Sequence, residues 1–366
     1  MAAARPQRLA QNSRSGSRSD EEFTPLHFGE MTSEALAAWA CRQGASAPAA
    51  RALARALVGR WAGSSDTVEP GKRLLARAEA TFRSDLPEAA CVTDPDGTRR
   101  LMVTYADAAV VETVVIPHPE RTTICLSTQV GCARACVFCE TGRLGLQRHL
   151  RAEEITAQFT LAARHLAASG MPAPTNVVFM GMGEPLDNLG PVLRAADVLA
   201  DDNGFAVAAR RISVSTVGIV PQMHAFYAHG RYRLAVSLHA ANDAEREALL
   251  PAARIWNLAQ LHAAIAASPR TVLLQWTLIE GVNDSDRHIE ELLRFTADLD
   301  VRLNLIPLNP GPADTLRAPP MPAIRAFQSK LQTAGLPTNV RLPHGQKIGG
   351  ACGQLAGGAR RGAGQT

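Results

Sequence analysis

Hydrophobic and polar positions along the chain follow two distinct patterns. Between about residues 31 and 82, apolar residues recur at helical spacing in stretches such as SEALAAWACRQ and AARALARALVGRW. In residues 94–100, DPDGTRR places an Asp-Gly turn between the strand-like runs CVT and LMVTYA, which predicts a β-hairpin. The run VVETVVIP predicts a further strand. We therefore expect a small helical region, with Trp39 and Trp61 in its core, followed by a hairpin extension.

From Thr122 onward, short β-branched runs alternate with amphipathic stretches of helical length. The strand-like runs are TICLSTQV, NVVFMGMG, RRISVST, RLAVSLHA, TVLLQWTLI, VRLNLIPLN and NVRL. Strands that alternate with helices pair in parallel, and about six such units predict an open or partial barrel. The sequence therefore predicts an α/β fold, a partial (β/α)6 barrel with a small N-terminal helical domain and a β-hairpin extension. Polar residues that follow its strands are candidates for chemistry.

These patterns divide the chain into five predicted parts. They are a disordered tail (1–22), a helical accessory domain (23–90), a hairpin extension (91–118), the barrel (119–345) and a flexible C-terminal segment (346–366). The tail is polar and arginine-dotted and lacks the apolar core of a secretory signal, although a transit peptide is an alternative. No apolar run approaches the roughly 18–20 residues of a membrane span. We expect a cytoplasmic protein with no membrane partner.

Composition and charge narrow the function classes only slightly. The 366-residue chain carries a net charge of +4, which permits a nucleic-acid partner without requiring one. Its seven cysteines form an odd count without a secretory signal, which favours metal or thiol chemistry over a disulfide framework.

The strongest signal is GCARACVFCETG, where Cys132, Cys136 and Cys139 follow a strand with C-x3-C-x2-C spacing. Three thiolates can hold three irons of a [4Fe–4S] cluster and leave the fourth open, whereas a closed structural zinc site needs four ligands. The spacing therefore favours a cluster; buried or zinc-binding cysteines are the alternative. An open iron can bind S-adenosylmethionine and pass an electron to its sulfonium.

These residues resemble the radical SAM superfamily. CARACVFC resembles its signature, with Phe138 at the usual aromatic position, and VVFMGMGEPLDN resembles its glycine-rich segment. The resemblance implies that Gly183 and Glu184 contact the methionyl amino group. SVSTVG, AVSLHA and LIPLNP end later strands and supply further candidate cofactor-binding residues: Ser215, Ser237, Leu238, His239 and Asn309. Taken singly, Ser215 fits a strand-end turn and His239 a satisfied buried histidine equally well.

A closer resemblance covers roughly residues 112–357. ICLSTQVGCARACVFC, GMGEPLDN, VSTVGIVP, LAVSLHAAND, LIEGVND, LNLIPLNP and ACGQLAG, in that order, resemble the RlmN/Cfr family of radical SAM adenine methyltransferases. The resemblance implies methylation of an adenine carbon, C2 or C8, in 23S rRNA or tRNA. It also implies a [4Fe–4S] cluster, two S-adenosylmethionine molecules per turnover and an external one-electron reductant such as flavodoxin. We expect a monomer.

The same resemblance assigns three catalytic residues. It implies that Cys352 carries the methyl group, that Cys125 releases the product by forming a transient disulfide with Cys352, and that Glu112 removes the proton from the adenine carbon. Without the resemblance, Glu112 is a solvated strand residue and Cys125 a core thiol. The remaining cysteines, Cys41 and Cys91, match no motif.

Several features depart from the family pattern. Glu140 follows the last cluster cysteine where a small residue is usual, and Lys347 precedes Ile348 where an aspartate is expected. The N-terminal helical region has no obvious match, so the RNA and the adenine carbon stay open. Candidate RNA contacts, equally readable as solvated arginines, are Arg143, Arg148, Arg151, Arg210 and Arg211. The alternatives are a radical SAM enzyme with another substrate and a catalytically silent cluster-bearing RNA-binding protein.

Overall fold

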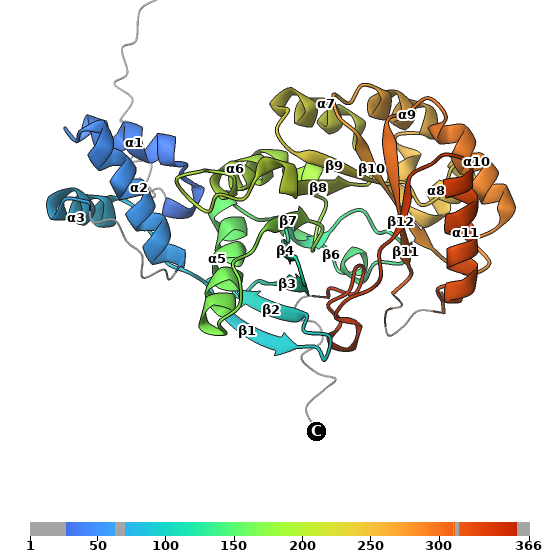
Figure 1. The fold of residues 1–366 in the computed structure, drawn as a ribbon, viewed down its shortest axis with the longest axis horizontal. Helices are drawn as coiled ribbons and strands as arrows, with labels where there is room; N and C mark the ends of the chain where they lie inside the picture. The colour runs from blue at the N-terminus through green and yellow to red at the C-terminus, as the bar shows by residue number, and fades with distance from the viewer. Residues whose placement is uncertain (1–26, 63–69, 310, 312–314, 357–366) are drawn as a thin grey trace, which may run out of the picture.

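A computed structural model describes residues 27–62, 70–309, 311 and 315–356, so the predicted tail over 1–22 lies outside it. Figure 1 shows α1 (Ser33–Arg42), α2 (Ala47–Ala62) and α3 (Lys72–Thr81) at one end of the molecule and the barrel at the other. Trp39 and Trp61 are buried among these helices, which confirms their predicted core role. The helices pack against the barrel through a shared cluster that includes Ala157.

One ten-stranded sheet runs through the rest of the fold, in the order β1-β2-β3-β4-β7-β8-β9-β10-β11-β12. Its first four strands pair antiparallel: β1 (Glu88–Thr93), β2 (Arg99–Thr104), β3 (Val110–His118) and β4 (Arg121–Cys125). The turn between β1 and β2 lies at the predicted Asp-Gly pair, where Gly97 has φ +85°. The antiparallel N-terminal region is therefore continuous with the barrel sheet.

The remaining strands pair in parallel and form the barrel wall with β4. They are β7 (Asn176–Phe179), β8 (Ile212–Thr216), β9 (Arg233–Ser237), β10 (Val272–Leu278), β11 (Val301–Pro307) and β12 (Thr338–Val340). The helices after these strands are α5 (Ala152–Ala168), α6 (Leu189–Leu199), α7 (Val220–His229), α8 (Asp243–Leu249), α9 (Leu258–Ala266), α10 (Asp286–Thr296) and α11 (Met321–Thr333). This alternation confirms the predicted partial barrel.

A small second sheet was not anticipated from the sequence. It pairs β5 (Gln129–Cys132) with β6 (Gly145–His149), and α4 (Glu140–Arg143) lies between them. The backbones approach closely at Gly131, where an added Cβ would lie 1.8 Å from the Gly145 carbonyl oxygen. These strands are short and irregular in register, so no alternation of apolar residues marks them. Short 3-10 turns complete the fold: Phe28–Glu30, Pro185–Asn188, Ala209–Arg211, Pro251–Arg254 and Gln346–Ile348.

Side-chain alternation along the barrel strands separates a packed outer face from an inner face that borders a cavity. Ile124, Val177 and Val214 are fully buried in the main core. Their neighbours Cys125, Val178 and Ser213 line the cavity instead. Polar residues can therefore occupy the strands without entering the apolar core. Within the described ranges, each helix is too short or too polar to cross a bilayer.

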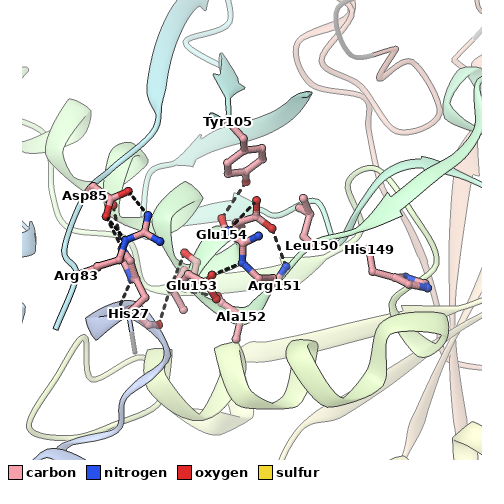
Figure 2. A network of polar contacts seen from close by, with 12 residues as sticks. His27, Arg83, Asp85, Tyr105, His149, Leu150, Arg151, Ala152, Glu153 and Glu154 are labelled. Carbon is pink, nitrogen blue, oxygen red and sulfur yellow. Dashed lines mark hydrogen bonds and ion pairs between the residues drawn. The ribbon is translucent and has the colours of Figure 1, made fainter. Parts of the chain in front are cut away.

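The start of α5 joins the N-terminal region, the hairpin and the barrel (Figure 2). The Arg151 amide donates to the Glu154 carboxylate at 2.8 Å, which caps the helix, and the Tyr105 hydroxyl donates to the Glu154 carbonyl at 2.9 Å. Nearby, Arg83 pairs with Asp85 at 2.9 Å. The Thr156 hydroxyl of α5 donates to the Gly29 carbonyl at 2.7 Å, so hydrogen bonds at this point join three parts of the chain that are distant in sequence.

Candidate active site

The three cysteines of the C-x3-C-x2-C segment gather where β5 ends and α4 begins. Cys132 is the last residue of β5, and Cys139 immediately precedes α4. Burial raises the pKa of the Cys132 thiol to about 12, and the nearby Cys139 thiol adds to this. Burial, Cys139 and Cys132 likewise raise the pKa of Cys136. The three sulfurs are thus close enough to influence one another, and a bound cation would favour their thiolate forms.

The spacing of these thiols fits a cluster better than a single ion. Among the described residues, no three His, Cys, Asp or Glu side chains converge on one metal-ion position. In a [4Fe–4S] cluster each thiolate binds a different iron, so its ligands stand further apart than those of one zinc. The three cysteines, which are close enough to raise one another's pKa, are therefore a donor set that suits the group that their sequence spacing predicts.

Cys136 and Cys139 open onto a cavity of about 160 Å³ at the carboxyl ends of the strands, which we call the cofactor cavity. Four of the predicted cofactor-binding residues line it: Ser215, Ser237, His239 and Asn309. Gly183, Glu184 and Leu238, the other three, do not line it. Leu238 is fully buried and donates its amide to the Gln275 carbonyl, so its side chain belongs to the core.

His239 is neutral in this environment. Its Nδ1 accepts a hydrogen bond from the Thr277 amide at 2.8 Å, and its ring meets Phe138 edge to face at 4.9 Å. Burial, with a smaller contribution from Arg246, lowers the pKa of His239 to about 3. Because Nδ1 is the acceptor, Nε2 carries the proton and is available as a donor.

The GMGEP turn after β7 brings two loops together. Gly183 has φ +101°, and an added Cβ would lie 2.6 Å from the Gln129 side chain, so both backbone and packing require glycine. The Glu184 carboxylate accepts from the Leu186 amide at 3.0 Å and from the Val217 amide at 2.8 Å. Burial raises the pKa of Glu184 to about 7. In this structure the Glu184 side chain therefore ties the loop after β7 to the loop after β8.

A larger cavity of about 840 Å³, here called the barrel cavity, runs along the inner face of the strands. Cys125 and Cys352 both line it, and Cys352 also lines the cofactor cavity. Burial raises the pKa of Cys125 to about 12, with the Cys352 thiol as the next cause. Both cysteines are free thiols. The structure thus brings together two thiols from opposite ends of the barrel sequence.

The loop that carries Cys352 is held on two sides. The Asn309 side-chain amide donates to the Cys352 carbonyl at 3.2 Å. The Glu140 amide donates to the Gly353 carbonyl at 2.8 Å, and the Thr141 hydroxyl donates to the Leu355 carbonyl at 2.6 Å. The described part of the predicted C-terminal segment, 346–356, is thus hydrogen-bonded to Glu140 and Thr141 and to Asn309.

A third anchor comes from the hairpin turn between β1 and β2. Asp94 accepts from the Lys347 amide at 3.0 Å, and Asp96 accepts from the Gly345 amide at 2.9 Å. The Nδ1 atom of His344 lies 3.6 Å from the Oδ2 atom of Asp96. The unexpected Lys347 therefore meets the hairpin through its backbone, a contact that does not depend on its side chain.

Glu112, the predicted base, lies on β3 beside the end of the loop that carries Cys352. It is fully buried on β3, where its carboxylate accepts from Arg100 at 2.8 Å and from the Ala356 amide at 3.1 Å. The solvated alternative is thus excluded. Glu112 is absent from the residues that line the cofactor and barrel cavities. In this conformation it secures the end of the Cys352 loop.

Sequence reasoning missed Gln275 and Arg341, which line both cavities beside Cys352. Gln275 is 4% exposed, and neither atom of its side-chain amide has a hydrogen-bond partner in the described chain. A glutamine within an apolar strand belongs to no recognisable sequence motif. Only the absence of hydrogen-bond partners for its amide in the described chain marks Gln275 as a candidate binding residue. Cys41 and Cys91 are exposed and lie outside both cavities.

The fold and the site together define a class of enzyme. A partial barrel with three cysteines in C-x3-C-x2-C spacing beside its first strand is the arrangement of radical SAM proteins, and residues 126–295 match the Radical SAM superfamily model. That superfamily implies a [4Fe–4S] cluster and S-adenosylmethionine.

Individual relatives narrow the assignment. A probable RNA methyltransferase of Sorangium cellulosum is 46% identical over 330 residues, covering 88% of this chain and 80% of that protein. The dual-specificity RNA methyltransferase RlmN of Halorhodospira halophila is 41% identical over 292 residues, covering 78% and 80%. A radical SAM methyltransferase from Sphaerobacter thermophilus has a crystal structure that matches with a TM-score of 0.82 and 36% identity, over 90% of this chain and 99% of that one. The chain belongs to the RlmN family of radical SAM RNA methyltransferases.

Proposed function

We propose that this protein methylates an adenine carbon, C2 or C8, in 23S rRNA or tRNA, using Cys352 as a methyl carrier. The main support for this function is the position of Cys352, which lines both the cofactor cavity and the barrel cavity. A sulfur in that position reaches a cofactor on one side and a substrate on the other. Similarity to RlmN, whose name specifies RNA methylation, supports the choice of substrate.

The chemistry explains why a carrier is needed. An aromatic C–H carbon is too poor a nucleophile to take a methyl group directly from a sulfonium. In the proposed sequence, the Cys352 thiolate first displaces S-adenosylhomocysteine from one S-adenosylmethionine and becomes S-methylated. Cys132, Cys136 and Cys139 would hold the cluster beside the cofactor cavity, and a second S-adenosylmethionine bound there would provide radical chemistry able to remove one hydrogen from this methyl group. The carbon then bonds to adenine, and the ring recovers its aromaticity by losing one proton and by passing one electron to the oxidised form of the external one-electron carrier.

Cys125 completes the cycle in this proposal. Its thiolate attacks the Cys352 sulfur, forms a disulfide and releases the carbon fragment, which gains a proton and becomes the methyl product. Burial raises the pKa of the Cys125 thiol, so this thiol is protonated in the free protein and must lose its proton before it attacks. The disulfide then requires two electrons from outside, and the cluster requires a one-electron donor such as flavodoxin.

The other residues hold the cofactor or the carrier loop. Ser215, Ser237 and His239 would bind polar groups of S-adenosylmethionine in the cofactor cavity, since their side chains line it. Gly183 and Glu184 would act through their backbone, because the Glu184 carboxylate is engaged by two amides.

Glu112 and Asn309 both contact the loop that carries Cys352. Glu112 would accept the adenine proton only after the Ala356 amide releases its carboxylate. Asn309 holds the Cys352 carbonyl and thereby sets the position of the sulfur.

Mass spectrometry of Cys352 tests the central claim. After anaerobic reconstitution, which we expect to give about four irons per chain, incubation with labelled S-adenosylmethionine and reductant should place a labelled methyl group on Cys352. Cys125→Ala should then trap a covalent protein–RNA adduct, and sequencing its RNA would identify the target. A reconstituted enzyme whose Cys352 acquires no label would overturn the mechanism, and a protein containing one zinc would overturn the cofactor assignment.

A further inference from the structure

The end of the barrel cavity that lies away from the cofactor is lined by arginines. Arg121 begins β4, Arg210 and Arg211 lie immediately before β8, and Arg233 begins β9. All four are exposed. They therefore lie at the amino-terminal ends of β4, β8 and β9, whereas the cofactor cavity lies at the carboxyl ends.

The charge of this group is not balanced locally. Among the described residues that line the barrel cavity, none is Asp or Glu, while these four arginines and Arg341 supply five positive charges. The four form no ion pair within the described part of the chain. By contrast, Arg231, two residues from Arg233, pairs with Asp197 at 2.9 Å. A cluster of unpaired cations in a concave surface attracts polyanions.

A second cavity lined by arginines lies at the start of α5, but its arginines are paired with carboxylates. Arg83, Arg148 and Arg151 line that cavity of about 560 Å³. Each is paired there, with Asp85, Glu154 and Glu153 respectively. Figure 2 labels Arg83 and Arg151. Two of the arginines that the sequence offered as RNA contacts are therefore already neutralised, whereas the four arginines without a described acidic partner line the barrel cavity.

The barrel cavity leads from these arginines to the reacting thiols. Arg121 and Cys125 lie on the same face of β4, four residues and therefore about 13 Å apart. A volume of about 840 Å³ falls within the usual range of ligand-binding cavities. At its inner end, the unpartnered amide of Gln275 offers a donor and an acceptor side by side, which complement the edge of an adenine.

We propose that the RNA enters the barrel from the amino-terminal side of the strands. Arg121, Arg210, Arg211 and Arg233 hold phosphates on either side of the target nucleotide, and its extruded base reaches Gln275 and the two thiols. This inference rests on the proposed function and adds the entrance, the phosphate contacts and the residue that meets the base.

The test compares Arg211→Gln and Arg233→Gln, singly and combined, with the matched control Arg231→Gln. RNA affinity is measured by fluorescence anisotropy against salt concentration, with a labelled RNA hairpin that carries an adenosine in its loop. For single-stranded RNA, each lost phosphate contact should lower the slope of log affinity against log salt by about 0.7, so the double variant should lose roughly 1.4. Arg231→Gln should retain the wild-type slope, since Asp197 already neutralises that arginine.

Methyl transfer to Cys352, which needs no RNA, separates the two claims. The inference predicts that the arginine variants still acquire labelled methyl on Cys352 while their KM for RNA methylation rises and kcat changes little. A double variant with the wild-type salt slope and KM would overturn the inference and leave the proposed function standing. A wild-type protein that never methylates Cys352 would overturn the proposed function instead.

Discussion

Replacing Asp94 and Asp96 with asparagine separates two roles of the hairpin turn. One oxygen of each carboxylate shapes the turn, because Asp94 accepts from the Asp96 amide at 3.1 Å and Asp96 accepts from the Thr98 amide at 2.8 Å. The other oxygen holds the Cys352 loop through the amides of Lys347 and Gly345. Asparagine retains one acceptor and presents an NH₂ group where the second stood. The turn should persist, and the contact with the loop should not.

The size of the effect follows from these two contacts. A hydrogen bond to a charged group contributes about 1.5–3 kcal/mol. Asp94 is only 6% exposed, whereas the Asp96 side chain is 36% exposed, so solvent screening places Asp96 at the lower end of that range. Because 1.4 kcal/mol is a factor of ten, Asp94→Asn should increase local opening of the loop by roughly 10- to 150-fold, and Asp96→Asn by about tenfold.

Amide hydrogen exchange at Gly345 and Lys347 measures this opening directly. Faster alkylation of Cys352 by iodoacetamide should accompany it, and RNA methylation should fall because the carrier sulfur is less well positioned. Asp202→Asn is the control, since that residue is exposed and has no described side-chain contact. Unchanged exchange at both amides in the double variant would refute the reasoning.

The same contact predicts a response to acid. Burial alone would raise the pKa of Asp96, but hydrogen bonds from the Gly345 and Thr98 amides outweigh it, and its pKa lies below the ordinary 3.8. A carboxyl group with a lowered pKa stabilises the fold above its unfolded pKa, and this stabilisation is lost as pH falls through the folded pKa. Protection of the Gly345 amide should therefore decline below about pH 4 in the wild type, and Asp96→Asn should remove this dependence.

Three further predictions concern residues around the two cavities. Gly183→Ala should lower the free energy of unfolding, measured by denaturant titration, by about 2–4 kcal/mol, because alanine is strained at positive φ and its Cβ would collide with Gln129. Gly170→Ala is the control: it has positive φ but open space around it and should cost only about 1 kcal/mol. Equal losses in the two variants would contradict this prediction. His239 has a pKa lowered to about 3, so wild-type stability should fall as pH drops from about 6.5 toward 3. His239→Asn, which tolerates φ +59° and retains an acceptor, should flatten that profile, and an unchanged slope would be the contrary result. Gln275→Leu should keep or raise the melting temperature, because it removes a buried amide that has no hydrogen-bond partner in the described chain. RNA methylation by this variant should fall. A marked loss of stability would show that the amide is hydrogen-bonded in the folded protein.

Local patterns in the sequence determined the architecture of this protein. The alternation of strand-like and helical runs predicted the parallel barrel because period and length are properties of single segments. The Asp-Gly pair predicted the hairpin, and the C-x3-C-x2-C spacing predicted the iron–sulfur chemistry, since ligands close in sequence are necessarily close in space. By contrast, β5 and β6 are too short to show a period, and only the structure reveals them.

Tertiary structure decided everything that depends on contacts between distant segments. It brought Cys125 and Cys352 to one cavity, buried Glu112 beneath Ala356 and attached the Cys352 loop to a hairpin turn far away in sequence. It also divided the arginines into those with an acidic partner, such as Arg148, and those with none among the described residues, such as Arg211, a distinction that no sequence pattern carries. Burial and ion pairing depend on which side chains meet after folding. The type of chemistry can therefore be predicted from the residues in the sequence, whereas the path of the substrate depends on the assembled barrel.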